Sequence, residues 1–189
     1  MNLVFRLLAV VVGACFRPRL RPLEESVLTF RVLPNDLDAN LHMNNGRYLT
    51  LMDLGRVDMM LRLGVLRELF RRRWSPVVGS ATVRFRRALA PFQRYELRTR
   101  ILCWDDRWFF MEQRFTRGGE LVAVGVVKAV FTGPEGWVAP QTLVDATGYG
   151  HVESPPVPPG IREWQEAEEA FYGRAAAPPP PQRVHAGSA

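Results

Sequence analysis

Polar side chains crowd one short segment, from Asn35 to Tyr48, which reads N-D-L-D-A-N-L-H-M-N-N-G-R-Y. Asp38, Asn40 and His42 occupy alternate positions, so an extended backbone would point all three side chains to the same side. A carboxylate beside an imidazole can activate a water molecule as a general base. The segment is therefore a candidate catalytic site.

A helix is expected to follow this segment directly. Asn44 is a good N-cap, the apolar positions keep helical spacing as far as Leu63, and Gly64 ends the pattern. The unpaired N–H groups near Asn44, Asn45 and Gly46 could hold a developing oxyanion. The same residue types are also ordinary turn and capping residues, and the spacing alone leaves both interpretations open.

The order of elements around this helix predicts the fold class. The helix is apolar on nearly every side, which indicates a buried helix. Four strand-like segments follow it with no helix between them, so they should pair antiparallel, with a hairpin closed at Gly118-Gly119. The expected strands are 26–33, 76–87, 95–104, 108–117 and 121–132. The sequence thus predicts an α+β domain in which a long sheet wraps around one helix.

The flanking segments divide the 189 residues into four parts. Residues 1–22 are apolar and then basic, 23–133 form the core domain, 134–174 hold a linker and a short helix, and 175–189 are an Ala/Pro-rich tail expected to be disordered. The apolar run from Leu7 to Phe16 has ten residues, whereas a membrane-spanning helix needs about 20.

Three interpretations of the N-terminal segment stay open. It could be a helix that packs on the domain, a helix in peripheral contact with a membrane through residues 3–16, or a signal sequence. The basic cluster from Arg17 to Pro22 favours a cytoplasmic location, peripheral to the inner face of the membrane if residues 3–16 touch it. We expect residues 1–22 to be dispensable for the fold.

Composition excludes several classes of protein. With 47% hydrophobic and 23% charged residues, the chain is an ordinary globular protein. Two cysteines and three widely spaced histidines give neither a disulfide framework nor a metal site. The net charge of +6 could favour an anionic ligand, but no nucleic-acid-binding motif is present, so we expect no nucleic-acid partner.

The pattern D-x-D-x-N-x-H-M-N-N-x-x-Y, followed by a buried helix, resembles the hotdog-fold thioesterases. It is most similar to the acyl-CoA thioesterase-like group and to plant acyl-ACP thioesterases, whose motif is D-L-D-x-N-x-H-V-N-N-x-x-Y. The resemblance covers about residues 23–133. It implies a hotdog fold, with a five-stranded antiparallel sheet around one central helix, and a homodimer or higher homo-oligomer with the acyl channel between subunits.

The resemblance also implies a reaction, the hydrolysis of an acyl-CoA or acyl-ACP thioester by water that Asp38 activates with help from His42. The catalytic Asp, Asn and His of the plant enzymes fall on Asp38, Asn40 and His42, and the catalytic Asp of 4-hydroxybenzoyl-CoA thioesterases also falls on Asp38. No metal or other cofactor is implied, because coenzyme A or the carrier protein is part of the substrate. The residues expected to bind substrate are Asn44, Asn45, Gly46, Tyr48, Arg84 and Arg86.

Two other kinds of activity remain as alternatives. A hotdog hydratase would also use an Asp and a His near this helix, and a non-catalytic acyl-binding protein at a membrane would need neither. Within the helix, Asp53 and Arg56 are three residues apart and could pair, which we interpret as a buried ion pair that fixes packing. Cys103 is expected to be a small buried apolar residue.

Overall fold

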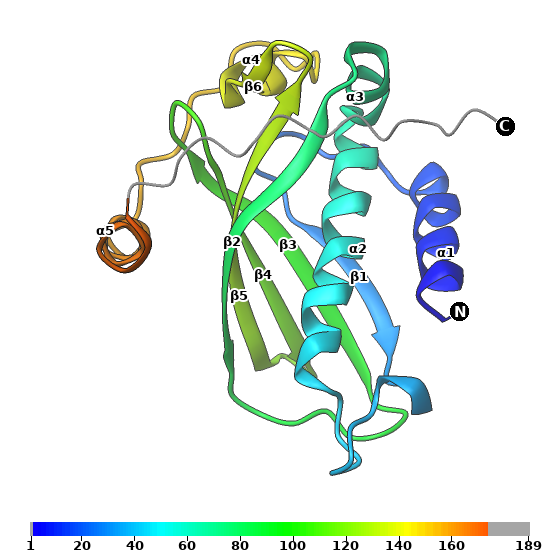
Figure 1. Ribbon diagram of the computed structural model, residues 1–189. Helices are drawn as coiled ribbons and strands as arrows, with labels where there is room; N and C mark the ends of the chain where they lie inside the picture. The colour runs from blue at the N-terminus through cyan, green and yellow to red at the C-terminus, as the bar shows by residue number, and fades with distance from the viewer. Residues whose placement is uncertain (1, 174–189) are drawn as a thin grey trace, which may run out of the picture.

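A curled antiparallel sheet wraps around one long helix in the computed structural model, which describes residues 2–173 (Figure 1). The strands lie in the order β1-β3-β4-β5-β2, and a short sixth strand, β6, pairs with β5. In chain order the elements are α1 (Asn2–Phe16), β1 (Ser26–Arg31), the 3-10 turn η1 (Pro34–Asp36), α2 (Asn45–Leu63), α3 (Leu66–Arg72), β2 (Ser75–Phe85), β3 (Arg94–Trp104), β4 (Phe109–Arg117), β5 (Glu120–Gly133), β6 (Gly136–Val138), α4 (Pro140–Asp145) and α5 (Pro159–Tyr172). The predicted α+β class, with a five-stranded sheet around a central helix, is confirmed.

The central helix α2 begins and ends where its capping residues predict. The side chain of Asn44 accepts a hydrogen bond from the Gly46 N–H, and Gly64 ends the helix in the left-handed region at φ 78°. Halfway along, Gly55 lies against Thr99 and Gln113 of the sheet, where a Cβ atom would collide with both side chains. Glycine at this position therefore lets the helix approach the sheet closely.

Every predicted strand is present, with boundaries within two residues of those expected. The short elements α3, β6 and α4 were not predicted, because each is too brief to show a periodic pattern. The prediction that α2 is buried all round is wrong on one side. Leu49 and Asp53, one turn apart, are exposed there, because the sheet covers one side of α2 and α1 packs on another.

The sheet's outer face carries the C-terminal helix α5. Trp164 of α5 packs edge-on against Phe110 at 6.4 Å, and Ile161 is buried beside Cys103. Burial raises the pKa of the Cys103 thiol to about 11, so this cysteine is the buried apolar residue that was expected. The predicted disordered tail, 175–189, lies outside the described residues.

The N-terminal helix α1 packs against α2 (Figure 1). Two of its arginines reach buried carboxylates, with Arg6 Nη2 2.6 Å from Asp36 Oδ2 and Arg17 Nη1 3.0 Å from Asp58 Oδ1. Val10 of α1 joins the main hydrophobic core. Packing on the domain, one of the three interpretations, is confirmed, and no described helix is long and apolar enough to cross a membrane.

These contacts go against the expectation that residues 1–22 are dispensable for the fold. Removing them would leave the Asp36 and Asp58 carboxylates in the interior without two of their cationic partners. A buried charge that loses its partner destabilises a protein strongly.

Replacing Arg6 by methionine tests this role for α1. Arg6→Met keeps the aliphatic stem but removes the cation, and Asp36 is left with the Leu33 N–H and with Arg47 at 3.7 Å. We expect the free energy of unfolding to fall by about 3 kcal/mol. Urea denaturation measures it, with Arg21→Met, at an exposed arginine, as the control. Equal losses in both variants would contradict the role given to Arg6.

Candidate functional site

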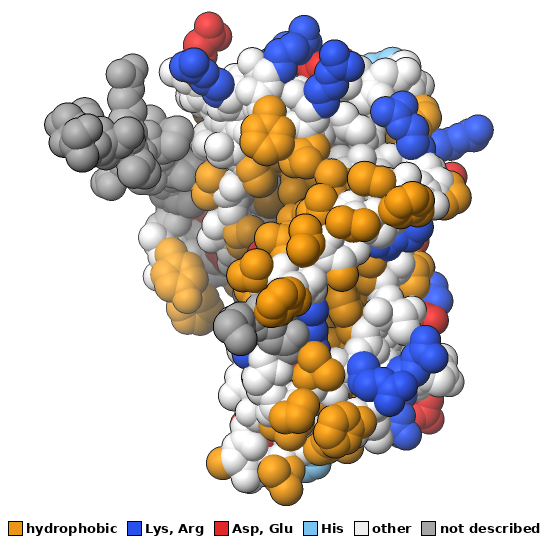
Figure 2. Space-filling model, turned by 90° about the vertical axis from the view of Figure 1, so that its right-hand side faces the viewer, with side chains coloured by type: hydrophobic (Ala, Val, Ile, Leu, Met, Phe, Trp, Pro, Cys, Tyr) orange, Lys and Arg blue, Asp and Glu red, His pale blue; other side chains and the backbone are white. Residues whose placement is uncertain are grey.

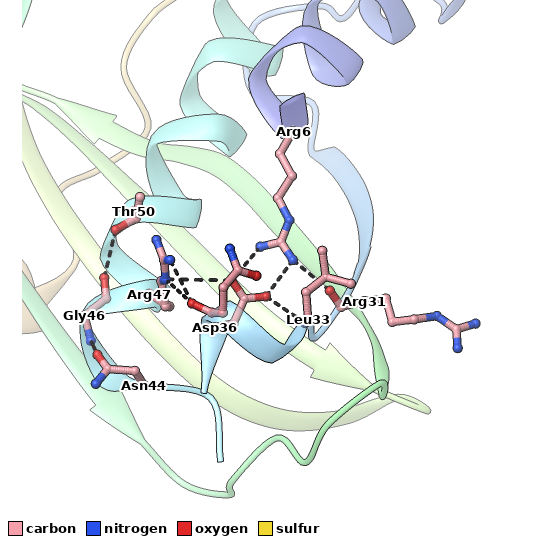
Figure 3. A network of polar contacts seen from close by, with 9 residues as sticks. Arg6, Arg31, Leu33, Asp36, Asn44, Gly46, Arg47 and Thr50 are labelled. Carbon is pink, nitrogen blue, oxygen red and sulfur yellow. Dashed lines mark hydrogen bonds and ion pairs between the residues drawn. The ribbon is translucent and has the colours of Figure 1, made fainter. Parts of the chain in front are cut away.

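The buried carboxylate of Asp36 fixes the position of the first residues of the polar segment (Figure 3). It accepts hydrogen bonds from both terminal nitrogens of Arg6, at 3.1 and 2.6 Å, and from the Leu33 N–H at 2.9 Å. The backbone carbonyl oxygen of Asp36 accepts the Asn44 N–H at 2.8 Å. The sequence marks Asp36 only as a capping residue, and its long-range partner Arg6 gives no local signal.

Asp38 lies at the start of a tight turn rather than on an extended strand. One carboxylate oxygen, Oδ1, accepts the backbone N–H groups of Asn40 at 2.9 Å and His42 at 3.3 Å, and Leu41 is left-handed at φ 57°. The expectation that three alternate side chains point the same way is therefore wrong, because the backbone folds back on the carboxylate. Within residues 2–173, no hydrogen bond or ion pair joins this carboxylate to the His42 imidazole.

Most backbone N–H donors at the start of α2 already have hydrogen-bond partners within the chain. The Asn44 N–H bonds to the Asp36 carbonyl at 2.8 Å, and the Gly46 N–H bonds to the Asn44 side chain at 2.8 Å. The Arg47 N–H bonds to the Asn44 carbonyl at 2.9 Å. Of the donors expected near Asn44, Asn45 and Gly46, the Asn45 N–H is the one that no bond occupies within the described residues.

Tyr48 is buried between aromatic rings. Its ring lies edge-on to that of Phe115, with 4.8 Å between ring centroids, and to that of Phe85, with 5.1 Å. Phe85 is the last residue of β2. Burial raises the pKa of the Tyr48 hydroxyl to about 12. This placement indicates a packing residue that fixes the start of α2 to the sheet, rather than the substrate-binding residue that was expected.

The two predicted phosphate-binding arginines are exposed at the end of β2. Neither Arg84 nor Arg86 has an ion-pair partner in the described part of the chain, whereas their neighbour Arg87 pairs with Glu120 at 2.8 Å. They form a basic rim close to the Tyr48–Phe85 contact. The geometry thus leaves both guanidinium groups available to an anionic group.

An apolar cavity of about 330 Å³ lies farther along α2, between this helix, the sheet and α4. Sequence reasoning did not find it, because it is assembled from side chains on several separate elements. Asp53, Arg56 and Thr147 are its polar lining residues in the described chain. The apolar lining residues are Pro22, Val57, Met59, Met60, Leu63, Val65, Pro76, Val78, Ile101, Phe109, Met111, Ala129, Phe131, Leu143 and Val144.

The buried side-chain amide of Gln113 positions Arg56, one of the polar residues that line this cavity. The Gln113 side chain accepts a hydrogen bond from Arg56 at 2.7 Å and donates to the Met52 carbonyl at 2.8 Å and to Thr99 Oγ1 at 3.0 Å. Burial lowers the pKa of the Arg56 guanidinium, while its pairing with Asp53 acts in the opposite direction. The position of Arg56 is thus fixed by Gln113, a partner that the sequence does not indicate.

The predicted pair of Asp53 and Arg56 forms, but it is buried on one side only. The Arg56 side chain is 12% exposed and that of Asp53 is 64% exposed. Asp53 therefore places a solvent-accessible carboxylate beside the cavity that both residues line.

The polar loop and the cavity do not meet within one chain. None of the predicted catalytic or substrate-binding residues is among the described residues that line the cavity. Asp53 lies eight residues beyond Asn45, a rise of about 12 Å along α2. A ligand in the cavity would reach Asp53 and Arg56 before it reached the Asp38 turn.

Comparisons with known proteins identify the family. The model of the thioesterase-like superfamily matches residues 32–165. The chain belongs to this superfamily. It is 34% identical over 158 residues to the protein THEM6 of Danio rerio, with 82% of this chain and 76% of that protein covered. It is 35% identical to THEM6 of Xenopus laevis, with 82% and 74% covered.

A solved structure also resembles this thioesterase-like protein. The gentisyl-coenzyme A thioesterase BH1999 is 25% identical, with a TM-score of 0.58, and the match covers 65% of this chain and 98% of that one. The fold of this chain is therefore that of hotdog thioesterases, as the sequence motif implied.

Two substitutions of Tyr48 separate packing from substrate contact. Tyr48→Phe keeps the ring contacts, so we expect its stability, and its hydrolysis of any acyl-CoA that the wild type hydrolyses, to stay close to those of the wild type. Tyr48→Ala empties a buried aromatic site and should lower the free energy of unfolding by about 3 kcal/mol or more. Thermal unfolding and turnover of a test acyl-CoA measure both effects. A large loss of turnover in a fully stable Tyr48→Phe protein would restore the substrate-binding role.

Proposed function

We propose that this protein hydrolyses acyl thioesters carried by coenzyme A or acyl carrier protein, at a site that two chains share. The observation that carries the proposal is the apolar cavity between α2, the sheet and α4, which has the size of a ligand pocket. Its volume of about 330 Å³ lies at the small end of ligand pockets, which suits an acyl or small aromatic acyl group. Membership of the thioesterase-like superfamily supports the same reaction.

The strand β2 offers the edge through which two chains could join. It ends the sheet order, it has 11 residues, and its outer edge is unpaired in the described chain. Such an edge favours pairing with another strand. The other edge strand, β1, has six residues, and Arg6 of α1 already bonds its last carbonyl, that of Arg31, at 2.9 Å. A two-fold dimer would therefore use β2.

Antiparallel pairing of β2 with its copy would bring the polar loop to the cavity. The Phe85 end of one strand would lie beside the Pro76 end of the other. Tyr48 packs on Phe85, so the start of α2 accompanies that end, whereas Pro76 and Val78 line the cavity. Each cavity would then face the Asp38 turn of the second copy, and the site would be complete only in the dimer.

The chemistry in such a site is the addition of water to a thioester. Asp38 takes a proton from water as the water oxygen bonds to the carbonyl carbon, with His42 assisting and Asn40 orienting the reacting groups. The Asn45 N–H donates to the developing oxyanion. Collapse of the tetrahedral intermediate breaks the C–S bond, and the sulfur leaves with its electron pair and gains a proton.

Binding of the carrier would use the basic rim. Arg84 and Arg86 are exposed guanidinium groups that could pair with the phosphates of coenzyme A or of a carrier protein's prosthetic group. The products are the free acid and the free thiol. Hydrolysis changes no oxidation state, so the mechanism requires no redox cofactor.

Removing the charge of Asp38 tests the catalytic assignment. Asp38→Asn keeps an oxygen that can accept the N–H groups of Asn40 and His42, but it cannot take a proton from water. We expect kcat to fall by about 10²- to 10⁴-fold. The measurement is steady-state hydrolysis of a panel of acyl-CoA and acyl-ACP substrates. Asp106→Asn, at an exposed aspartate between β3 and β4, is the matched control and should keep its turnover.

Two results would contradict the assignment. A loss smaller than about tenfold in a folded Asp38→Asn protein would remove Asp38 as the base. Binding of acyl-CoA without turnover by the wild-type protein, across the whole panel, would support the non-catalytic acyl-binding alternative instead.

A complementation experiment tests the shared site. Asp38→Asn disables the loop, and Met60→Trp fills the cavity that Met60 lines. In a mixed dimer of the two variants, one site carries both defects and the other carries neither. Equal co-expression should therefore restore about a quarter of the wild-type activity, because about half of the dimers are mixed. Separately purified variants provide the baseline, and sedimentation gives the mass of the assembly.

A site formed within one chain predicts the opposite result of the complementation experiment. If the loop and the cavity of one chain formed the site together, each site of a mixed dimer would carry one defect, and activity would stay at the baseline. An active wild-type monomer of 21.5 kDa would contradict the dimer as well.

A further inference from the structure

The helix α1 packs with its charged side inward and its apolar side outward. Arg6 and Arg17 point to the buried carboxylates of Asp36 and Asp58, and Val10 lies between them in the core. At about 100° per residue, these three positions fall on one side of the helix. A helix on a protein surface ordinarily has the reverse arrangement.

The outward side of α1 is a continuous apolar surface, which we call the α1 apolar face. Phe5 is 62% exposed and Phe16 is 85% exposed. Figure 2 shows hydrophobic side chains gathered across the side of the molecule that α1 occupies, with basic side chains around them. The residues of the α1 apolar face are Val4, Phe5, Leu8, Val12 and Phe16.

The charged side chains of α1 and of the residues just after it are basic as far as Glu24, whose carboxylate accepts the Arg21 N–H at 2.8 Å. Residues 1–23 contain four arginines and no acidic residue. Arg6 and Arg17 are engaged inward, which leaves Arg19 and Arg21 exposed just beyond the helix, without an ion-pair partner among the described residues. Apolar side chains with adjacent arginines match the interface of an anionic bilayer, where the side chains enter the lipid and the guanidinium groups meet headgroup phosphates.

We propose that the α1 apolar face docks the protein on an anionic lipid membrane, with α1 lying in the plane of the interface. A second copy of the chain is the less suitable occupant, because an α1–α1 contact would bring Arg19 and Arg21 of both copies together, and Glu24 is the first carboxylate along the chain that could offset their charge. The helix has 15 residues, too few to cross a bilayer, for which about 20 are needed. Docking in the plane keeps the Arg6 and Arg17 ion pairs intact.

Vesicle sedimentation of the full chain tests the proposal. The probe is sucrose-loaded vesicles of phosphatidylcholine with about 30% phosphatidylglycerol, compared with phosphatidylcholine alone. We expect the wild-type protein to sediment with the anionic vesicles and more weakly with the neutral ones. The triple variant Phe5→Gln, Leu8→Gln, Val12→Gln should lose binding by at least about tenfold, because three apolar side chains no longer enter the lipid.

A matched control uses exposed apolar residues away from α1. The triple variant Phe70→Gln, Phe171→Gln, Tyr172→Gln removes as many large side chains from α3 and α5 and should bind like the wild type. Arg19→Gln with Arg21→Gln should reduce binding to the anionic vesicles and leave the weaker neutral binding unchanged. Circular dichroism and thermal unfolding verify that each variant is folded.

Three results would overturn the proposal. One is a wild-type protein that stays in the supernatant with anionic vesicles. Another is an α1 triple variant that is folded and binds as well as the wild type. The third is a decrease in the oligomer mass of the α1 triple variant in sedimentation velocity without lipid, which would assign the α1 apolar face to a second copy of the chain.

Discussion

One buried carboxylate, Asp36, ties together the N-terminal helix, the end of the first strand and the start of the central helix. Removing a carboxylate from water is costly unless cations and N–H donors replace the lost hydration. Here those groups come from Arg6 of α1, the Leu33 N–H and, more distantly, Arg47 of α2. The polar loop that begins at Asp36 is therefore positioned by an element distant in sequence.

Asp58 is a second buried carboxylate that binds an arginine of α1, and Asp36 and Asp58 together set the orientation of this helix. The Asp58 carboxylate accepts a hydrogen bond from Ser26 Oγ at 2.5 Å and pairs with Arg62 at 3.4 Å as well as with Arg17. Arg6 and Arg17 are eleven residues apart, about three helical turns, so both reach inward from the same side. With two inward arginines fixed, the rotation of α1 leaves its apolar side facing outward.

Local signals predicted the elements of the fold, and long-range contacts account for what the sequence did not show. The Asn44 cap, Gly64 and the Gly118-Gly119 hairpin are recognisable from neighbouring residues, and the structure has all three. The turn at Asp38 differs from the extended segment expected, because backbone N–H groups bond to the carboxylate. The residues of the candidate site were recognisable from the motif, but the cavity depends on packing between elements that no local pattern links.

Long-range contacts also explain why the net charge of the sequence says little about what its arginines do. The net charge of +6 indicated no more than a possible anionic ligand, yet individual arginines have distinct structural roles. Arg6 and Arg17 neutralise buried carboxylates, and Arg56 is held by Gln113 at the cavity. Counting net charge cannot separate such inward arginines from those, like Arg84, that stay exposed.

The proposed dimer and the proposed membrane contact use different surfaces of the molecule. Figure 1 places β2 and α1 on opposite sides of α2, and α1 makes its main contacts with α2. Pairing of β2 edges therefore leaves both α1 helices uncovered, and the two-fold assembly would present two α1 apolar faces. Two weak interfacial contacts on one rigid assembly bind a surface more tightly than either alone, since the second contact is intramolecular. The β2 pairing and the twist of the joined sheet set the angle between the two copies, and that angle sets how the two α1 apolar faces are inclined to one membrane.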